Sequence, residues 1–140
     1  MSTALDTNIL VDLLAGDQPS ARAASAALDA AGRRGALVVC PAVHAGLLAF
    51  PGRSAVDVDA LLEDVGIDVD WQMAEAAWRR AGEAFAGHAA RRRSAAASAP
   101  RRILADFLIG AHALSGAATL LTRDDRFFRT VFPELTVERP

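Results

Sequence analysis

The sequence predicts an α/β fold, a three-layer α/β/α sandwich with a central, mainly parallel sheet. Short apolar runs alternate with helical patterns along the chain, and this order requires crossover connections between parallel strands. The run Ala36–Cys40 is continuously apolar between Gly35 and Pro41, as expected of a strand buried on both faces. Asp6 and Asp124 each follow an apolar run, at the strand ends where such folds bind ligands.

The first half of the chain is predicted to hold three strands and four helices. The apolar runs Thr3–Leu5, Ala36–Cys40 and Ile67–Asp70 are the expected strands. Helices are expected between them at residues 9–15, 19–33, 41–50 and 55–65. The expected helix caps are Asn8, Asp17 and Ser54 at the starts, with Gly16, Gly35 and Gly66 at the ends.

The second half is predicted to add three helices and two strands. A helix is expected over 71–87, with Met73, Ala77, Ala81 and Phe85 on one stripe. Residues 88–100 are rich in Ala, Ser and Arg, and the sequence is compatible with either a polar helix or a mobile loop there. The remaining expected elements are a helix from 103 or 105 to 114, a strand at 118–121, a helix at 125–131 and a strand at 135–137.

Length and composition indicate one domain over residues 1–140, with a mobile basic segment at 88–102. The 140 residues include 52% hydrophobic residues, enough for a substantial core. The apolar runs are far shorter than the roughly 18 residues that a membrane span needs, and no signal peptide is expected. The lone Cys40 is predicted to be a buried thiol, and together these features favour the cytoplasm.

The charges are segregated although the net charge is only −2. Residues 57–70 are acidic without a base, every basic residue of the chain is Arg, and residues 79–102 carry a basic stretch interrupted only by Glu83. This stretch is interpreted either as solvated helix faces or as a phosphate-contacting patch, because guanidinium groups bind phosphate oxygens in pairs. The candidate RNA-contacting residues are Arg91, Arg92, Arg93, Arg101 and Arg102. At this net charge, any affinity for nucleic acid must be local.

Three aspartates far apart in the sequence are the candidate reactive centre. Asp6 follows the first strand, Asp124 follows the fourth, and Asp106 opens an apolar helix. Each could instead simply cap a helix, but their ordered placement favours convergence at one sheet edge. Crowded carboxylates repel one another unless a cation neutralises them, and Mg²⁺ and Mn²⁺ prefer oxygen ligands. Such a site is suited to activating water against a phosphodiester.

The segments Leu5–Asn8, Asp106–Ala113 and Leu121–Phe128 together resemble a PIN domain, most like the VapC-type toxins of bacterial toxin–antitoxin pairs. The resemblance implies a Mg²⁺- or Mn²⁺-dependent endoribonuclease acting on single-stranded RNA, a homodimer, and inhibition by a small antitoxin protein whose C-terminal tail fills the groove. It maps Asp6, Asp106 and Asp124 to metal-binding acids. It also maps Asn8 and Thr122 to polar positions that support them, with Asp125 assisting.

One expected acid is missing from this pattern. The resemblance places a glutamate five residues past Pro41, and this chain has Gly46 there, with no Asp or Glu between Asp29 and Asp57. The change is either a natural loss or one made to silence a toxic protein. His44 and His112 are weak candidates to replace the acid, and His88 is expected to be solvated. We therefore expect a nuclease that is attenuated or inactive.

Other classes fit less well. A receiver domain would need a Lys, an Asp-x-Asp phosphatase would need an acid at Asn8, and a dinucleotide-binding fold would need a Gly-rich turn after the first strand. The serious alternative is a non-catalytic PIN domain that binds RNA or a partner protein without cutting.

Overall fold

The computed structural model describes residues 1–16, 18–94, 101–116 and 118–140. Within these residues, five short strands form one sheet: β1 Thr3–Leu5, β2 Leu37–Val39, β3 Ile67–Val69, β4 Thr119–Leu121 and β5 Val137–Glu138. The same described ranges contain seven helices that connect the strands: α1 Thr7–Ala15, α2 Gln18–Arg34, α3 Pro41–Leu47, α4 Ala55–Val65, α5 Glu75–Ser94, α6 Leu104–Ser115 and α7 Asp125–Val131.

The sheet is entirely parallel, with the strand order β3-β2-β1-β4-β5. β1 lies in the middle, where Thr3 is in register with Leu37 on one side and with Thr119 on the other. The chain winds outward from β1 to β3 and then returns to the other side of β1 through β4 and β5. The strand order therefore reverses between β1 and β4, which is where α/β sheets form a crevice for ligands.

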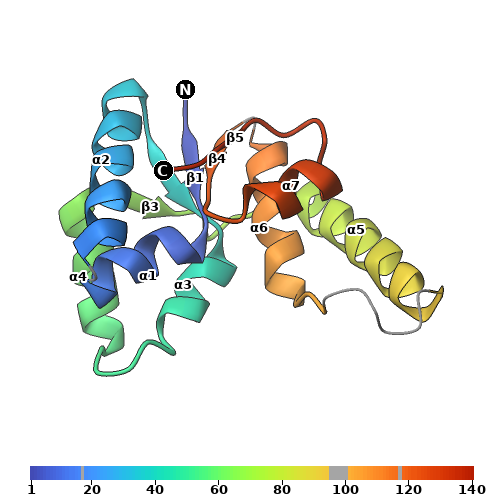
Figure 1. Cartoon of the computed structure of the whole chain (residues 1–140), viewed down its shortest axis with the longest axis horizontal. Helices are drawn as coiled ribbons and strands as arrows, with labels where there is room; N and C mark the ends of the chain where they lie inside the picture. The colour runs from blue at the N-terminus through green and yellow to red at the C-terminus, as the bar shows by residue number, and fades with distance from the viewer. Residues whose placement is uncertain (17, 95–100, 117) are drawn as a thin grey trace.

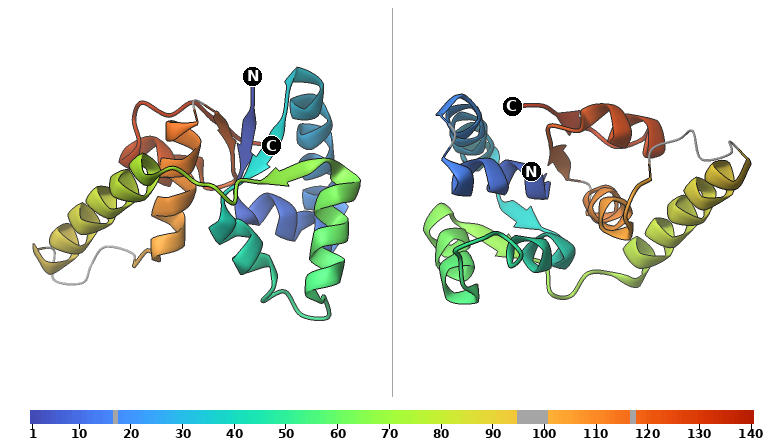
Figure 2. Two further views of the ribbon diagram at one scale, coloured as in Figure 1. Left: turned by 180° about the vertical axis from the view of Figure 1, so that it is seen from behind. Right: turned by 60° about the horizontal axis from the view of Figure 1, so that its bottom comes forward.

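Helices cover both faces of the sheet, so the predicted three-layer α/β/α sandwich is confirmed. Figures 1 and 2 show α1, α2 and α4 on one side of the strands and α5, α6 and α7 on the other. α3 begins directly beyond the end of β2, and the N-terminal end of α6 lies at the same edge of the sheet (Figure 1). Across the described residues, no helix is both long and apolar enough to span a membrane.

Most predicted boundaries in the first half agree with the structure because local signals set them. β1 and α4 have the predicted bounds, and Ser54 with Asp57 forms a capping box at the start of α4. α1 differs: it begins at Thr7, and Asp6 rather than Asn8 is its cap. α3 ends at Leu47, earlier than residue 50. The proposed cap Asp17 lies outside the described residues.

The larger difference is in α5. It begins at Glu75 rather than at residue 71, because backbone turns at Trp71 and Met73 precede it. It continues past Gly87 to Ser94, since Ala and Arg are strong helix formers. Of the basic segment 88–102, residues 88–94 are therefore helical. Residues 95–100 lie outside the described residues, so the mobility of the segment stays a prediction.

The core lies on both faces of the sheet and includes the predicted buried thiol of Cys40, whose pKa is raised by burial. On the α6–α7 side, Phe107, Phe128 and Phe132 are fully buried. Gly110 on α6 lies against the Phe128 and Phe132 rings, and a Cβ atom there would collide with Phe132. This close approach fixes how α7, which follows Asp124, packs against α6, which carries Asp106.

Candidate active site

Asp6 has a buried carboxylate at the carboxyl end of the central strand. Its Oδ1 accepts the backbone N–H of Thr7 at 2.7 Å and so caps α1. Its Oδ2 accepts the hydroxyl of Thr122 at 2.6 Å and the side-chain amide of Asn8 at 3.2 Å. Asp6 is thus both a helix cap and a carboxylate held in one orientation by groups from two strand ends.

Thr122 joins the ends of β1 and β4. Besides donating to Asp6, its Oγ1 accepts the backbone N–H of Asp124 at 2.9 Å. Asn8 closes the arrangement, because its side-chain oxygen accepts the backbone N–H of Arg123 at 3.2 Å. This network lies at the reversal of strand order. Asn8 and Thr122, the predicted supporting positions, thus lie directly against Asp6.

The three aspartates are close enough to influence one another's ionisation. Burial is the main cause that raises the pKa of Asp6, and the negative charges of Asp106 and Asp124 raise it further. The hydrogen bonds from Thr122 and Thr7 act in the opposite direction. Burial also raises the pKa of Asp106, where Arg102 lowers it and Asp124 raises it. Each pair among the three acids is thus electrostatically coupled, as expected of carboxylates at one edge.

Arg102 occupies the place beside Asp124 that a cation would take. Its guanidinium donates to Asp124 Oδ2 at 2.5 Å and lies over the Phe127 ring, 4.3 Å from the centroid. Asp124 occupies the N-cap position directly before α7, but its side chain makes no capping hydrogen bond. The alternative that Asp124 serves as a helix cap therefore fails, and its carboxylate is instead neutralised by Arg102.

The three carboxylates lie near one another in this structure but do not converge on one point. Within the described parts of the chain, no three His, Cys, Asp or Glu side chains converge tightly enough to hold one metal ion. The negative charges of Asp106 and Asp124 act unfavourably on Asp6, and Arg102 pairs with Asp124. The three acids are nevertheless a fitting set for Mg²⁺ or Mn²⁺, because they offer only oxygen ligands and carry mutually unfavourable charge.

The profile of the PIN domain family matches residues 3–133 of the chain. The chain belongs to the PIN domain family. Comparison with curated proteins gives no significant match. The family assignment confirms the resemblance inferred from the three aspartate segments.

Three solved structures of similar fold illustrate the likeness of this PIN domain to known proteins. VapBC2 from Rickettsia felis, bound to a DNA fragment from the promoter, has a TM-score of 0.69 and 19% identity, covering 99% of this chain and 98% of that chain. VapBC-1 from nontypeable Haemophilus influenzae has a TM-score of 0.66 and 21% identity, with the same coverage. FitAcB from Neisseria gonorrhoeae has a TM-score of 0.60 and 18% identity over 96% of this chain and 95% of that chain.

Gly46, where the PIN domain lacks the expected acid, lies on α3 beside the network of Asp6. A Cβ atom added at Gly46 would lie 3.8 Å from Cγ2 and 3.9 Å from Oγ1 of Thr7, which is ordinary van der Waals contact. Gly46 is not among the described glycines with positive φ, so its backbone accepts an L residue. Position 46 thus has room for a side chain, directed toward the residue that follows Asp6.

The histidines of the PIN domain do not replace the missing acid. His44 Nε2 lies 2.8 Å from Asp59 Oδ1, and its ring packs edge-on against Trp71. His112 Nε2 lies 3.0 Å from Asp70 Oδ2. His88, expected to be solvated, instead accepts the backbone N–H of Arg102 at 3.2 Å.

Asp125 is paired with two arginines. Arg129 pairs with it at 2.7 Å and Arg139 at 2.9 Å. The hydrogen bond from Arg139 is the main cause that lowers its pKa. These contacts favour a structural role for Asp125, because they link α7 to Arg139, which directly follows β5.

The predicted basic residues gather around the ends of α5 and α6. Arg91, Arg92 and Arg93 lie in the last turn of α5, while Arg101 and Arg102 directly precede α6. They line two adjoining pockets that share His88 and Arg102. Only the first of these pockets also includes Asp124.

Sequence reasoning missed one ion pair that supports the site. Asp12 on α1 is buried and pairs with Arg123 Nε at 2.8 Å. Arg123 lies between Thr122 and Asp124, so this pair links α1 to the segment that carries Asp124. Asp124 is one of the three aspartates, Asp6, Asp106 and Asp124, that together are called the acid centre. The available signal was an acidic residue within the apolar segment Ile9–Ala15, which calls for a buried partner.

Proposed function

We propose that the protein is a metal-dependent endoribonuclease, the toxin of a type II toxin–antitoxin pair, attenuated by Gly46. The observation that carries this proposal is the network of Asp6, Thr122 and Asn8 at the reversal of strand order, with Asp106 and Asp124 coupled to it by charge. Membership of a family that generally comprises nucleases supports it.

Asp6, Asp106 and Asp124 are the proposed ligands of Mg²⁺ or Mn²⁺. When bound, such an ion supplies charge stabilisation and a more acidic water for attack on the phosphodiester. Thr122 and Asn8 hold the Asp6 carboxylate in one orientation, because both donate to its Oδ2. Arg102 contacts one oxygen of Asp124 and would compete with an ion for that carboxylate; when released, its guanidinium would be available to an RNA phosphate.

Gly46 is the proposed cause of attenuation. Position 46 faces Thr7, and a glutamate there would bring a fourth carboxylate beside the residue that follows Asp6. Without it, ion binding is weaker and the attacking water is less well placed. The acids that remain are expected to give slow cleavage or none.

The proposed partners are single-stranded RNA as substrate, a cognate antitoxin and a second copy of this chain, in the cytoplasm. The similar structures named VapBC2, VapBC-1 and FitAcB come from toxin–antitoxin systems, and their likeness in fold over nearly the whole chain supports an antitoxin partner. The candidate RNA contacts are the arginines at the C-terminal end of α5 and just before α6, since one guanidinium group can donate two hydrogen bonds to the same phosphate.

The deciding experiment is an RNA-cleavage assay with Mg²⁺ and with Mn²⁺ on the unaltered chain, Asp6→Asn, Gly46→Glu and Gly46→Gln. We expect Gly46→Glu to cut far faster than the unaltered chain, and Gly46→Gln, with the same shape but no charge, to give no gain. Strong cleavage by the unaltered chain that Asp6→Asn abolishes would contradict attenuation and keep the nuclease.

The second candidate is a PIN domain that binds RNA or protein without cutting. The Arg102–Asp124 pair favours it, because this pair neutralises one of the acids within the chain itself. It predicts that Gly46→Glu remains inactive while the unaltered chain retains its affinity for RNA or for an antitoxin.

A further inference from the structure

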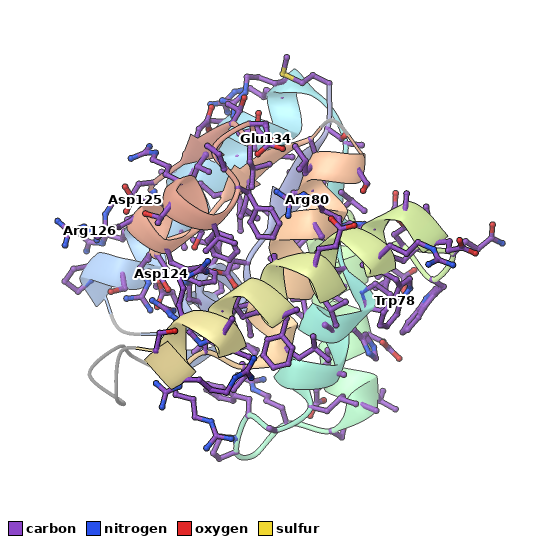
Figure 3. The ribbon with its side chains drawn as sticks, turned by 90° about the vertical axis from the view of Figure 1, so that its right-hand side faces the viewer. Trp78, Arg80, Asp124, Asp125, Arg126 and Glu134 are labelled. Carbon is purple, nitrogen blue, oxygen red and sulfur yellow. The ribbon has the colours of Figure 1, made fainter. Side chains whose placement is uncertain are left out.

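A small basic pocket adjoins the acid centre between α5 and α7. It has a volume of about 260 Å³ and is lined by His88, Arg91, Arg102, Asp124, Arg126, Phe127, Thr130 and Val131. Figure 3 looks onto this face, with Asp124 between α7 and the C-terminal half of α5 and with Arg126 at the start of α7. The pocket therefore opens directly onto one of the proposed metal-binding acids.

The charge of the pocket selects an anion. Three guanidinium groups face one carboxylate, and that carboxylate is already paired with Arg102. Among the described residues, neither Arg91 nor Arg126 forms an ion pair with an acidic side chain, so both guanidinium groups add positive charge to the pocket. The pKa of His88 is lowered by burial and then by Arg91, Arg92 and Arg102, which is consistent with a positive local potential.

The size and the apolar floor of the pocket narrow the choice of anion. Pockets for larger ligands usually measure roughly 300–1,000 Å³, so this volume suits one nucleotide unit rather than a bulky ligand. Phe127 and Val131 supply apolar surface beside the arginines, and a ribose or base edge can pack there. A phosphate attached to a sugar matches this combination better than a carboxylate side chain does.

We propose that this pocket binds the RNA phosphate and sugar next to the bond being cut, with Arg91 and Arg126 as the phosphate-binding residues. Arg102 connects the pocket to the acid centre, since the same guanidinium lines the pocket and contacts Asp124. Arg126 was not among the residues expected to contact RNA. The neighbouring pocket, lined by Arg92, Arg93, Arg101 and Arg102, lacks Asp124 and would contact RNA farther from the reacting bond.

This assignment rests on the proposed nuclease function but is tested without cleavage. The affinity of a short fluorescein-labelled single-stranded RNA is measured by anisotropy in EDTA, over a series of KCl concentrations. The variants are Arg91→Gln and Arg126→Gln. The matched controls are Arg93→Gln, which removes the same charge two residues along α5, and Arg22→Gln on the exposed surface of α2.

We expect Arg91→Gln and Arg126→Gln each to weaken RNA binding about three- to tenfold and to lower the slope of log K against log salt by about 0.7. Arg93→Gln should have a smaller effect and Arg22→Gln none. An effect of Arg93→Gln equal to that of Arg91→Gln would mean that RNA is held by general electrostatic attraction rather than by this pocket, and it would overturn the assignment.

A second arm separates RNA from an acidic protein tail. If Arg91→Gln and Arg126→Gln leave RNA affinity unchanged but weaken binding of a glutamate-rich peptide, the pocket is a protein site and the proposal is wrong. The outcomes are also distinct from those of the cleavage assay. Loss of RNA binding with no cleavage by Gly46→Glu keeps the pocket and rejects the nuclease. If Gly46→Glu cuts RNA while Arg91→Gln and Arg126→Gln leave RNA affinity unchanged, the nuclease function is kept and the pocket assignment is rejected.

Discussion

The two sides of the acid centre differ sharply in how well they are built. At the β1–β4 side, Asp6, Asn8 and Thr122 form a closed set of hydrogen bonds between 2.6 and 3.4 Å. At the α3 side, Gly46 faces Thr7 with no side chain at all. The hydrogen bonds that orient the Asp6 carboxylate, proposed to be catalytic, are therefore complete, whereas the position on α3 where the PIN resemblance expects a further acid has no side chain. Orientation and ligand number are thus separable properties of this site.

The largest expected effect is on the β1–β4 side, where replacing Thr122 by Val should lower the stability of the protein. Val keeps the shape but removes the hydroxyl that donates to buried Asp6 and accepts from Asp124. We expect the free energy of unfolding to fall by about 2 kcal/mol, in the range for hydrogen bonds to charged groups. Chemical denaturation measures it, and Thr130→Val on the exposed face of α7 is the control, expected within about 0.5 kcal/mol of the unaltered chain. Equal losses in both variants would contradict the central part given to Thr122.

Filling the incomplete side should have the next largest effect. Gly46→Glu is expected to raise the affinity for Mg²⁺ by about tenfold, equivalent to about 1.4 kcal/mol. The change is read as the additional Mg²⁺-dependent rise in melting temperature, because an ion that binds only the folded state stabilises it. Gly46→Gln tests whether size alone matters, and an equal rise with Gln would show that the added carboxylate is not a ligand.

Freeing Asp124 should give a smaller gain. Arg102→Gln removes the partly exposed ion pair with Asp124, which competes with a metal ion for the same carboxylate. We expect the affinity for Mg²⁺ to rise about threefold, equivalent to about 0.6 kcal/mol, in the range for partly exposed pairs. Calorimetric titration with Mg²⁺ measures it. Arg101→Gln removes the neighbouring exposed charge, and a gain as large there would indicate a general charge effect.

The smallest expected effect concerns Asp106. Burial raises its pKa, so the folded protein holds this proton more tightly than the unfolded chain does. The ionised carboxyl therefore lowers stability above the raised pKa, and this cost disappears as the pH falls below the ordinary value of 3.8. Asp106→Asn should raise the melting temperature slightly at neutral pH without Mg²⁺, and the gain should vanish at pH values below that ordinary value. A gain that is independent of pH would exclude ionisation as its cause.

Local signals allowed much of the fold and part of the site to be predicted. Ser54, Gly66 and the apolar runs mark boundaries through contacts within a few residues, and the strand ends then place Asp6 beside Thr122. The cap of α1 was wrong because Asp6 and Asn8 are both good caps, and only the geometry of the folded strand end decides between them.

The unforeseen contacts all depend on tertiary placement. The pairs Arg102–Asp124 and Asp12–Arg123 join residues that no periodicity connects. The part proposed for Arg126 depends on α7 lying beside α5, a tertiary placement to which the contact of Arg80 on α5 with the Phe132 ring contributes. Sequence patterns indicated which residues are chemically suited to the site, but not which partners they have in the folded chain.

The bond from Thr122 to Asp6 spans 116 positions along the chain. During synthesis on a ribosome, Asp6 emerges early and must wait for β4 before it is held in its final orientation. Until β4 is in place, the Asp6 carboxylate lacks the Thr122 hydroxyl that helps to orient it. The central place of β1 in the sheet thus makes the final orientation of Asp6 depend on a strand near the end of the chain.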